Sequence, residues 1–352
     1  MGKTIVKSVV WIFGTLIVFL AAAQLTGWFL STPRYVGEMS PNFDGKRFIN
    51  PGGIRASGLG DLLKWVLNRE KGAWEYRMEI PYGPKPITSV NGDGIRITFV
   101  NHATFLIQTS GLNILTDPVW SDRVGPGGKL GPHRRRPPGI RFEDLPPIDI
   151  VLLSHNHYDH LDLQTLQRLV PLHKPAIYCP LGVAAFLESE GFPGAVDMDW
   201  WSETDLQAGL VLACVPAQHF SGRGSFDRDG SLWCGFVIRR ESGNIYFAGD
   251  SGYGQFFREI GLRYAPIRVA MIPIGAYLPR WFMNPIHTSP EEALLIHRDV
   301  GARRSIGMHY GTFPLADDGM DRPVEDLNRS RQEMSIDSES FVLLEEGKPR
   351  DF

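Results

Sequence analysis

The chain has 352 residues, a length that allows two average domains or one large α/β domain. Hydrophobic residues make up 43% and charged residues 21% of the chain, which argues against a disordered protein. Lys and Arg together number 36 against 39 Asp and Glu, a net charge of -3. This balance provides no basic field to hold a nucleic-acid backbone, so no nucleic-acid partner is expected. The three cysteines form no CxxC pair, which argues against a disulfide scaffold.

The N-terminal segment is strongly apolar. Two lysines precede a charge-free run over residues 8–33, which is long enough to cross a bilayer as one helix. We therefore predict that residues 1–30 form a single-pass anchor in a bacterial inner membrane, with the rest of the chain on the periplasmic side. The small residues 21–23 leave open a cleaved signal peptide and export, and a buried core helix is a third alternative.

Residues 31–60 are rich in Pro, Gly and Asn and are predicted to be a linker with irregular contacts, followed by a folded domain over 61–352. At the start of that domain, residues 96–118 predict antiparallel strands joined by a Ser-Gly turn. The basic run at 133–136 lies in a Pro/Gly-rich loop. It is interpreted either as a solvated loop or as a contact for anionic headgroups.

Short strands and helices alternate along the rest of the domain. The continuous apolar run at 148–153 predicts a strand buried on both faces. Further apolar runs predict strands at 176–179, 211–215, 245–248, 269–274 and 305–308. Helices are expected after Asp162, over 183–190, and from the capping box that begins at Ser289. Hairpins followed by βαβ units predict a layered α/β sandwich with mixed sheets.

Candidate metal ligands follow the ends of four predicted strands. They are His155, His157, Asp159, His160, His219, Asp250 and His309. One such histidine alone is more often a packed core or surface residue. In open α/β sheets, however, ligand sites form beyond the carboxyl ends of strands, so we expect the seven side chains to converge. Imidazole and carboxylate suit two zinc ions, with Asp250 able to bridge them, and iron or manganese would also suit.

The HxHxDH cluster with the later His, Asp and His resembles the metallo-β-lactamase superfamily, which implies a four-layer αββα sandwich. The likeness is closer to the N-acylphosphatidylethanolamine-hydrolysing phospholipases D. The stretches that carry it are FAGDSGY (247–253), IPIGAYLPRWFM (272–283) and MHYGTFPLA (308–316). The family implies a zinc-dependent phosphodiester hydrolase. Its products would be phosphatidic acid and an N-acylethanolamine, released from N-acylphosphatidylethanolamine or a related phospholipid.

The resemblance also implies a role for each candidate residue. One zinc ion would bind His155, His157 and His219. The other would bind Asp159, His160 and His309, with Asp250 shared. The side chains implied in catalysis are Asp159, Asp250 and His287, with His287 near the substrate phosphate. Asp117 would orient a ligand, or simply form a turn before Pro118.

Tyr158, Tyr253 and Tyr277 are interpreted as side chains that orient the phosphate, although Tyr158 and Tyr253 suit a packing role equally well. The apolar run at 281–283 after Arg280 indicates contact with a membrane surface, or a core stripe. A homodimer is allowed.

Two alternatives to the phospholipase remain. One is a hydrolase of the same fold acting on another ester, a lactone or a nucleotide, because function depends on the pocket. The other is a membrane-tethered scaffold with a structural metal. Seven candidate ligands favour an open two-metal site over a closed four-coordinate one.

Overall fold

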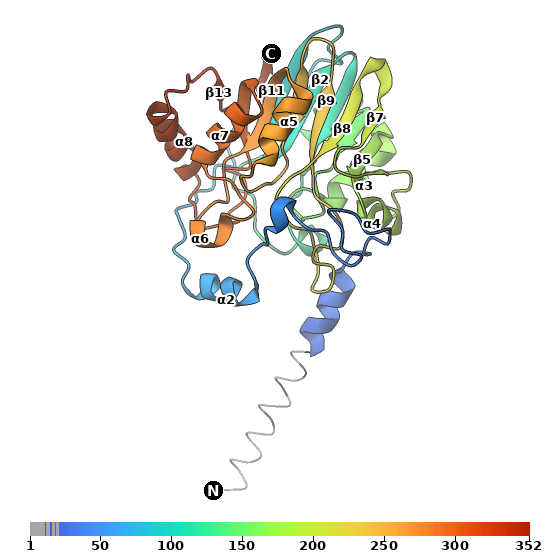
Figure 1. Ribbon diagram of the computed structural model, residues 1–352, viewed down its shortest axis with the longest axis vertical. Coiled ribbons are helices and arrows are strands. Elements are labelled where there is room, and N and C mark those ends of the chain that lie inside the picture. Colours follow the sequence, from blue (N-terminus) through green and yellow to red (C-terminus); the bar gives the residue numbers. More distant parts are fainter. Residues whose placement is uncertain (1–10, 12–14, 16–17, 19–20) are drawn as a thin grey trace, which may run out of the picture.

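The computed structural model describes residues 11, 15, 18 and 21–352. Two seven-stranded sheets face each other, and helices cover their outer faces (Figure 1). The strand orders are β14-β1-β2-β3-β4-β5-β6 and β13-β12-β11-β10-β9-β8-β7. Both sheets combine parallel and antiparallel pairs, so the predicted layered sandwich with mixed sheets is confirmed.

The first sheet begins with the predicted antiparallel strands. Its members are β1 (Ile95–Asn101), β2 (Thr104–Thr109), β3 (Leu112–Thr116), β4 (Ile150–Leu152), β5 (Ala176–Pro180), β6 (Val196–Met198) and β14 (Pro349–Asp351). From β3 to β6 the neighbours are parallel. The outer face of this sheet packs on α3 (Leu163–His173) and α4 (Val183–Ser189), where Leu166, Leu169 and Leu187 are fully buried. Asp162 caps α3 as predicted, because its side chain accepts from Gln164 N.

The second sheet contains the remaining strands. They are β7 (Glu203–Asp205), β8 (Val211–Val215), β9 (Gly235–Arg239), β10 (Asn244–Phe247), β11 (Ile267–Pro273), β12 (Ala302–Met308) and β13 (Phe341–Val342). The other helices are α2 (Leu59–Leu67), α5 (Phe256–Tyr264), α6 (Arg280–Met283), α7 (Pro290–Asp299) and α8 (Arg322–Glu333), with short 3-10 turns at Pro51–Gly53, Pro126–Gly128, Phe142–Asp144 and Gln207–Gly209. Helix α7 packs on β11 and β12 and opens with the predicted capping box of Ser289 and Glu292.

The N-terminal prediction needs correction. Residues 21–30 are helical and project from the body of the molecule (Figure 1). Among the residues that the structure describes, no helix is long and apolar enough to cross a bilayer, which contradicts the predicted single-pass anchor and the inner-membrane localisation. The other part of that segment, residues 1–10, 12–14, 16–17 and 19–20, lies outside the described residues.

Residues 31–57, which we call the N-terminal strap, run along the domain without regular strands or α-helices. Tyr35 N donates to the carbonyl of Gly230 (2.7 Å), and Phe48 N donates to that of Asp229 (2.9 Å). Phe43 and Phe48 are buried beside Leu232 and Trp233 in a cluster of their own. The strap is therefore packed against the 229–233 loop. The predicted division into 1–30, 31–60 and 61–352 stays a prediction.

Candidate metal centre

The seven candidate ligands follow the strands as the sequence predicts. Four follow β4, and one each follows β8, β10 and β12: His155, His157, Asp159, His160, then His219, Asp250 and His309. Strand β9 is antiparallel to β8 and β10, and β11 is parallel to β10 and β12. Strands β8, β10 and β12 therefore run in the same direction. Their carboxyl ends therefore meet at one edge, and the structure brings all seven side chains together there.

Three imidazoles form the first ligand group. His155 Nε2 lies 2.8 Å from His157 Nδ1, and His219 Nε2 lies 3.2 Å from the same atom. Nitrogens bound at about 2.0–2.1 Å to one tetrahedral ion lie roughly 3.3 Å apart, so this spacing suits a shared zinc-type cation. The Nδ1 of His219 lies 2.9 Å from the carbonyl of Ile286, which can only accept. It therefore carries the proton and leaves Nε2 with a lone pair facing the group.

A second group lies beside the first and includes Asp159, His160 and His309. Asp159 Oδ2 lies 3.4 Å from His160 Nε2 and 3.5 Å from His309 Nε2. Asp250 joins the two groups. Its Oδ2 lies 3.0 Å from His309 Nε2, 3.2 Å from His160 Nε2 and 3.8 Å from His219 Nε2.

Asp117, which follows β3, fixes the orientation of two ligands. Its Oδ2 accepts from His160 Nδ1 (2.6 Å) and from the hydroxyl of Ser154 (2.6 Å). Because the Ser154 hydroxyl donates its proton to Asp117, its oxygen can only accept from His155 Nδ1, which lies 2.9 Å away. Both imidazoles therefore turn Nε2 toward the centre, which is the orienting role that the family implies for Asp117.

Several buried polar atoms of the site have no hydrogen-bond partner among the described residues. Nε2 of His160, Nε2 of His309 and Oδ1 of Asp250 are buried and have no hydrogen-bond partner. Buried polar atoms are rarely left unpaired in proteins, because their desolvation is costly. Imidazole nitrogens and carboxylate oxygens that converge in this way suit positive charge, whether protons or metal ions, so the residues fit two divalent cations. Zinc matches the donor types, and iron or manganese is not excluded.

The imidazoles of the first group are held neutral. Burial lowers the pKa of His155 and His157 well below its usual value, and neighbouring imidazoles lower it further. Burial also lowers the pKa of His219 to about 4, in spite of the opposing charge of Asp250. Neutral imidazole is the form that binds a metal.

The second group behaves in the opposite way. Burial alone would lower the pKa of His309, but the carboxylates of Asp250 and Asp159 outweigh it and raise the pKa to about 9. The same two carboxylates, with Asp117, hold the pKa of His160 well above its usual value despite burial. Without metal, the second group therefore holds protons at neutral pH.

The other predicted residues lie at different distances from the centre. His287 is buried beside it, with Nδ1 at 3.9 Å from Asp250 Oδ2 and no hydrogen-bond partner for that nitrogen. The three tyrosines do not share this placement. The hydroxyls of Tyr158, Tyr253 and Tyr277 donate to the Arg223 carbonyl, Asp299 and Asp326 respectively. Among the hydrogen bonds of the described residues, none joins these hydroxyls to a candidate ligand, so their phosphate-orienting role stays a prediction.

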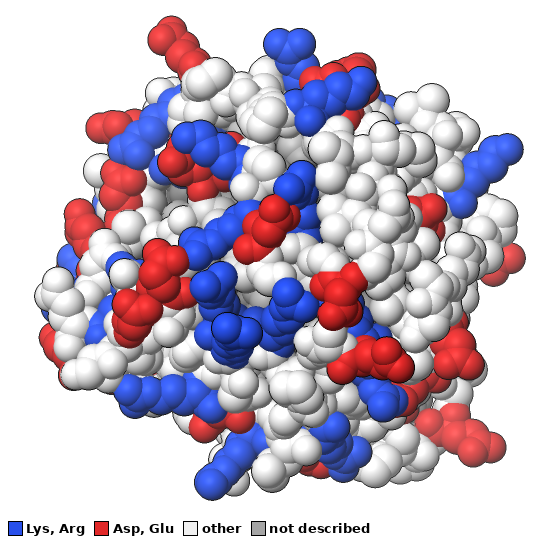
Figure 2. All heavy atoms as spheres, turned by 90° about the horizontal axis from the view of Figure 1, so that it is seen from above, with Lys and Arg blue, Asp and Glu red and all other residues white. Residues whose placement is uncertain are grey.

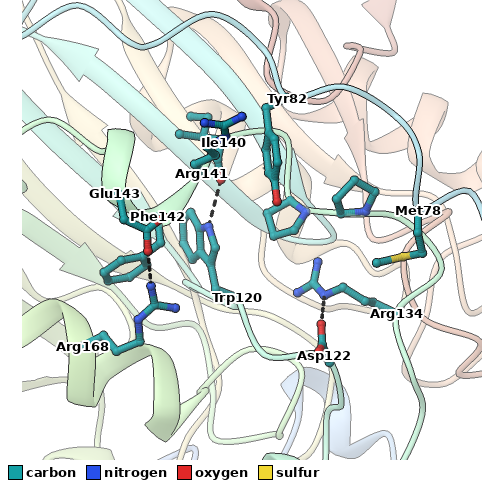
Figure 3. A pocket seen from close by; sticks show the side chains of 12 residues that line it. Met78, Tyr82, Trp120, Asp122, Arg134, Ile140, Arg141, Phe142, Glu143 and Arg168 are labelled. Atoms are coloured by element: carbon teal, nitrogen blue, oxygen red, sulfur yellow. Dashed lines mark hydrogen bonds and ion pairs between the residues drawn. The ribbon is translucent and has the colours of Figure 1, made fainter.

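The basic run at 133–136 braces a site loop. The guanidinium of Arg134 is buried and donates to the carbonyls of Ser121 and Val119. It borders a cleft of about 270 Å³ that contains none of the candidate ligands, between Tyr82 and Trp120 (Figure 3). Arg135 N donates to the carbonyl of Thr312, three residues after His309. Arg134 is thus not solvated, and contact of the run with anionic headgroups stays a prediction.

Sequence reasoning missed His102, which lies in the turn between β1 and β2. Its Nε2 lies 2.9 Å from Asp159 Oδ2, and its ring is tilted against that of His309, with the centroids 4.0 Å apart. Burial, with the charge of His309, lowers the pKa of His102 to about 3, so the neutral ring donates one N–H to the carboxylate. The signal was a histidine directly after an apolar strand, inside a stretch that we interpreted only as a hairpin.

His102→Ala is expected to weaken metal binding at the second group by about 10–100-fold, the usual cost of losing a partner that orients a metal ligand. Titration against a competing chelator measures this affinity, and metal analysis gives the number of ions per chain. His133→Ala is the control, because that half-buried imidazole bonds the carbonyl of Arg134 and contacts the ring of Tyr76, neither of which belongs to the metal centre. Equal affinities in the two variants would contradict the role of His102.

Comparison with known proteins places the chain in a family. Residues 112–310, more than half of the chain, match the model of the beta-lactamase superfamily domain. The chain belongs to the beta-lactamase superfamily. Within it, the chain belongs with the N-acylphosphatidylethanolamine-hydrolysing phospholipases D. It is 36% identical over 293 residues to N-acyl-phosphatidylethanolamine-hydrolyzing phospholipase D 1 of Caenorhabditis elegans, covering 77% of this chain and 80% of that protein.

Two further proteins resemble the chain. An uncharacterized protein of Mycobacterium tuberculosis is 38% identical over 311 residues, covering 84% of this chain and 80% of the relative. A metallo hydrolase structure from Ignicoccus hospitalis has a TM-score of 0.56 at 23% identity, covering 74% of this chain and 98% of the other, and shows the shared fold. The two mixed sheets are thus a metallo-β-lactamase fold, and the protein is a metal-dependent hydrolase. The alternative of a non-catalytic scaffold is wrong.

Proposed function

We propose that this beta-lactamase superfamily member is a phosphodiesterase of phospholipase D type. Its substrate is N-acylphosphatidylethanolamine or a related phospholipid, and its products are phosphatidic acid and an N-acylethanolamine. The observation that carries the proposal is the pair of adjoining ligand groups with Asp250 between them. The name of the C. elegans relative supports the choice of substrate.

In this proposal, His155, His157 and His219 hold one divalent cation. Asp159, His160 and His309 hold the other, and Asp250 contacts both. Two such cations supply Lewis acidity at the phosphate and lower the pKa of water. The protein fixes their separation through the buried, mutually oriented ligands, which is the positioning that phosphoryl chemistry requires.

His287 is proposed to handle a proton. Burial lowers the pKa of His287 well below its usual value, so the ring is neutral, and its Nδ1 is free and faces Asp250. A neutral imidazole at this position can accept a proton from the attacking water and pass it to the leaving alcohol oxygen. Asp250 stays ionised, because His160 and His309 hold its pKa well below the usual range in spite of burial.

The end of the molecule that holds the site also presents apolar side chains. Helices α2 and α6 lie at the end from which helix 21–30 projects (Figure 1). Leu59 and Leu67 of α2 are 72% and 82% exposed, and Lys64 lies over the half-exposed Trp281 ring. The opposite face carries many charged side chains of both signs (Figure 2). Exposed leucines with Trp and Lys suit the boundary of a lipid bilayer, so we propose that this end contacts the membrane surface.

A paired substitution tests this contact. Leu59→Asp combined with Leu67→Asp is expected to lower turnover of vesicle-borne substrate by at least roughly tenfold, since burial of each leucine is worth about 1.5–3 kcal/mol. Metal content and turnover of a soluble short-chain phosphodiester should not change. Leu262→Asp is the matched control, because Leu262 is 81% exposed on α5. An unchanged rate on vesicles in the paired variant would refute the membrane contact.

The substrate is tested directly. The zinc-loaded protein should release the N-acylethanolamine from N-acylphosphatidylethanolamine, and a chelator should stop the reaction until zinc is restored. Lactones, nucleotide phosphodiesters and other esters are offered in parallel, because the same fold serves many substrates. Turnover of one of these, with none of the phospholipid, would favour the alternative hydrolase. The homodimer stays a prediction.

A further inference from the structure

Asn50 of the N-terminal strap contacts a candidate ligand directly. The side chain is buried, with 6% of its surface exposed. Its Nδ2 donates to the carbonyl of His219 (2.8 Å), and its Oδ1 accepts from the N–H of His219 (2.8 Å). Oδ1 also accepts from the indole of Trp233 (2.8 Å), and Nδ2 also donates to the carbonyl of Ile54 (3.1 Å). The amide therefore has partners on both of its atoms.

The paired bonds hold the backbone of His219 in place. This residue follows β8 in a loop, so no strand ladder fixes its N–H and C=O. Among the hydrogen bonds of the described residues, only those from Asn50 reach these two groups. Bonds to both groups of one residue set its position and its rotation. The bond from Nδ1 to Ile286 then aims Nε2 at the first ligand group.

We propose that Asn50 is a positioning residue for His219, through which the N-terminal strap completes the first ligand group. The inference rests on the proposed metal ligation by His219. Asn50 lies outside residues 112–310, the part that matches the superfamily model. The chain thus supports one of its metal ligands from a segment that its sequence marks as irregular.

The strap is fixed firmly enough to do this. Both N and Oγ1 of Thr32 donate to Asp227 Oδ2 at 2.9 Å, at the start of the strap. Near its other end, Phe48 N donates to the carbonyl of Asp229, and the Phe48 ring is buried. Asn50 is therefore held in position before any metal binds, which is the preorganisation that a metal site needs.

The amide chemistry explains why asparagine suits this position. Aspartate has the same shape but no donor, so Asn50→Asp keeps acceptors for His219 N and Trp233 and loses the bond to the His219 carbonyl. Alanine leaves the N–H and the C=O of His219 without partners in a buried site, while the Trp233 indole keeps its bond to the carbonyl of Ala217 (3.0 Å). Asn50→Asp thus removes one of the two bonds to the His219 backbone, and Asn50→Ala removes both.

Metal binding by the full chain tests the inference. Wild type is expected to bind two Co²⁺ ions per chain. Asn50→Asp and Asn50→Ala are expected to bind the ion at the first group about 10–100-fold more weakly, with an altered cobalt absorption spectrum. Asn42→Ala is the matched control, because Asn42 is a strap asparagine, 7% exposed, whose amide donates to Asp199 instead. It should bind cobalt like wild type.

Two measurements keep the result interpretable. Circular dichroism and the thermal midpoint establish that each variant is folded, and Asn50→Asp retains the test if Asn50→Ala does not fold. Wild-type cobalt affinity and spectrum in a folded Asn50→Asp protein would overturn the inference. Lipid turnover by wild type reports on the proposed function separately, since a protein that binds two ions without cleaving phospholipid would refute only that function.

Discussion

Asp250→Ala is expected to abolish binding of both metals and to lower hydrolysis by at least about 10³-fold, a loss comparable to removing a key electrostatic group from an active site. Asp250 is the carboxylate that faces both ligand groups, with Oδ2 at 3.0 Å from His309 and 3.8 Å from His219. Its removal also leaves His160 and His309 without their main counter-charge, in a buried site where unpaired charge is costly.

A second substitution separates the groups. Asp159 contacts His160, His309 and His102 and has no contact with His219. Asp159→Asn should therefore remove one ion and leave the first group loaded, while still abolishing activity. Metal analysis after gel filtration counts the ions, and an assay on phospholipid measures the loss.

The control for these variants is a carboxylate outside the centre. Asp197 accepts from Gly182 N and Ala184 N at the start of α4 and contacts no candidate ligand. Asp197→Asn is expected to keep two ions and full turnover. Two tightly bound ions in folded Asp250→Ala protein would show that the carboxylate is not shared.

The strands that position the site could be predicted because they are buried on both faces. The predicted strand at 211–215 coincides with β8, and those at 245–248 and 305–308 overlap β10 and β12 closely. Continuous apolar runs mark such strands whatever their partners are. Short polar edge strands such as β7 and β14 carry no such signal, since hydrogen bonding to a neighbour alone defines them.

The convergence of the candidate ligands could be predicted because a strand end fixes where its loop begins. The residues that support them were not, because their contacts arise only after distant segments pack. His102 meets Asp159 across 57 positions of sequence, and Asn50 meets His219 across 169. Tyr253 and Tyr277 show the converse, since their hydroxyls bond carboxylates of α7 and α8 that no local pattern connects to them. Spacing along the chain points to candidate ligands, and tertiary contacts determine what orients them.

The two ligand groups should take up metal with different pH dependence. In the metal-free protein, the pKa of His309 is raised to about 9 by Asp250 and Asp159 against the effect of burial, so its ring is protonated at neutral pH. A metal ion must displace that proton, which means that the apparent affinity of the second group rises with pH up to about 9. His160 in the same group also holds a proton, and each proton displaced corresponds to about a tenfold gain in affinity per pH unit.

The first group should show almost no such dependence above pH 6. Burial lowers the pKa of His155 and His157 well below its usual value and that of His219 to about 4, so these rings are already neutral. Zinc titrations at pH 6, 7.5 and 9 should therefore show one tight ion at the lowest pH and two at the highest. The Asp159→Asn variant should bind only the zinc ion of the first group, with an affinity that does not change over this pH range.

Protonation of His309 also affects the stability of the metal-free protein. A histidine whose pKa is raised on folding stabilises the metal-free protein fully below its unfolded value of about 6.5, and that contribution is lost as pH rises through about 9. The free energy of unfolding of the metal-free protein should thus fall over this pH window. In the zinc-loaded protein the ion replaces the proton and binds more tightly as pH rises, so the free energy of unfolding should fall less. Denaturant titrations of the two forms at several pH values measure this difference. If the free energies of unfolding of both forms changed equally with pH, His309 would not exchange its proton for a metal ion.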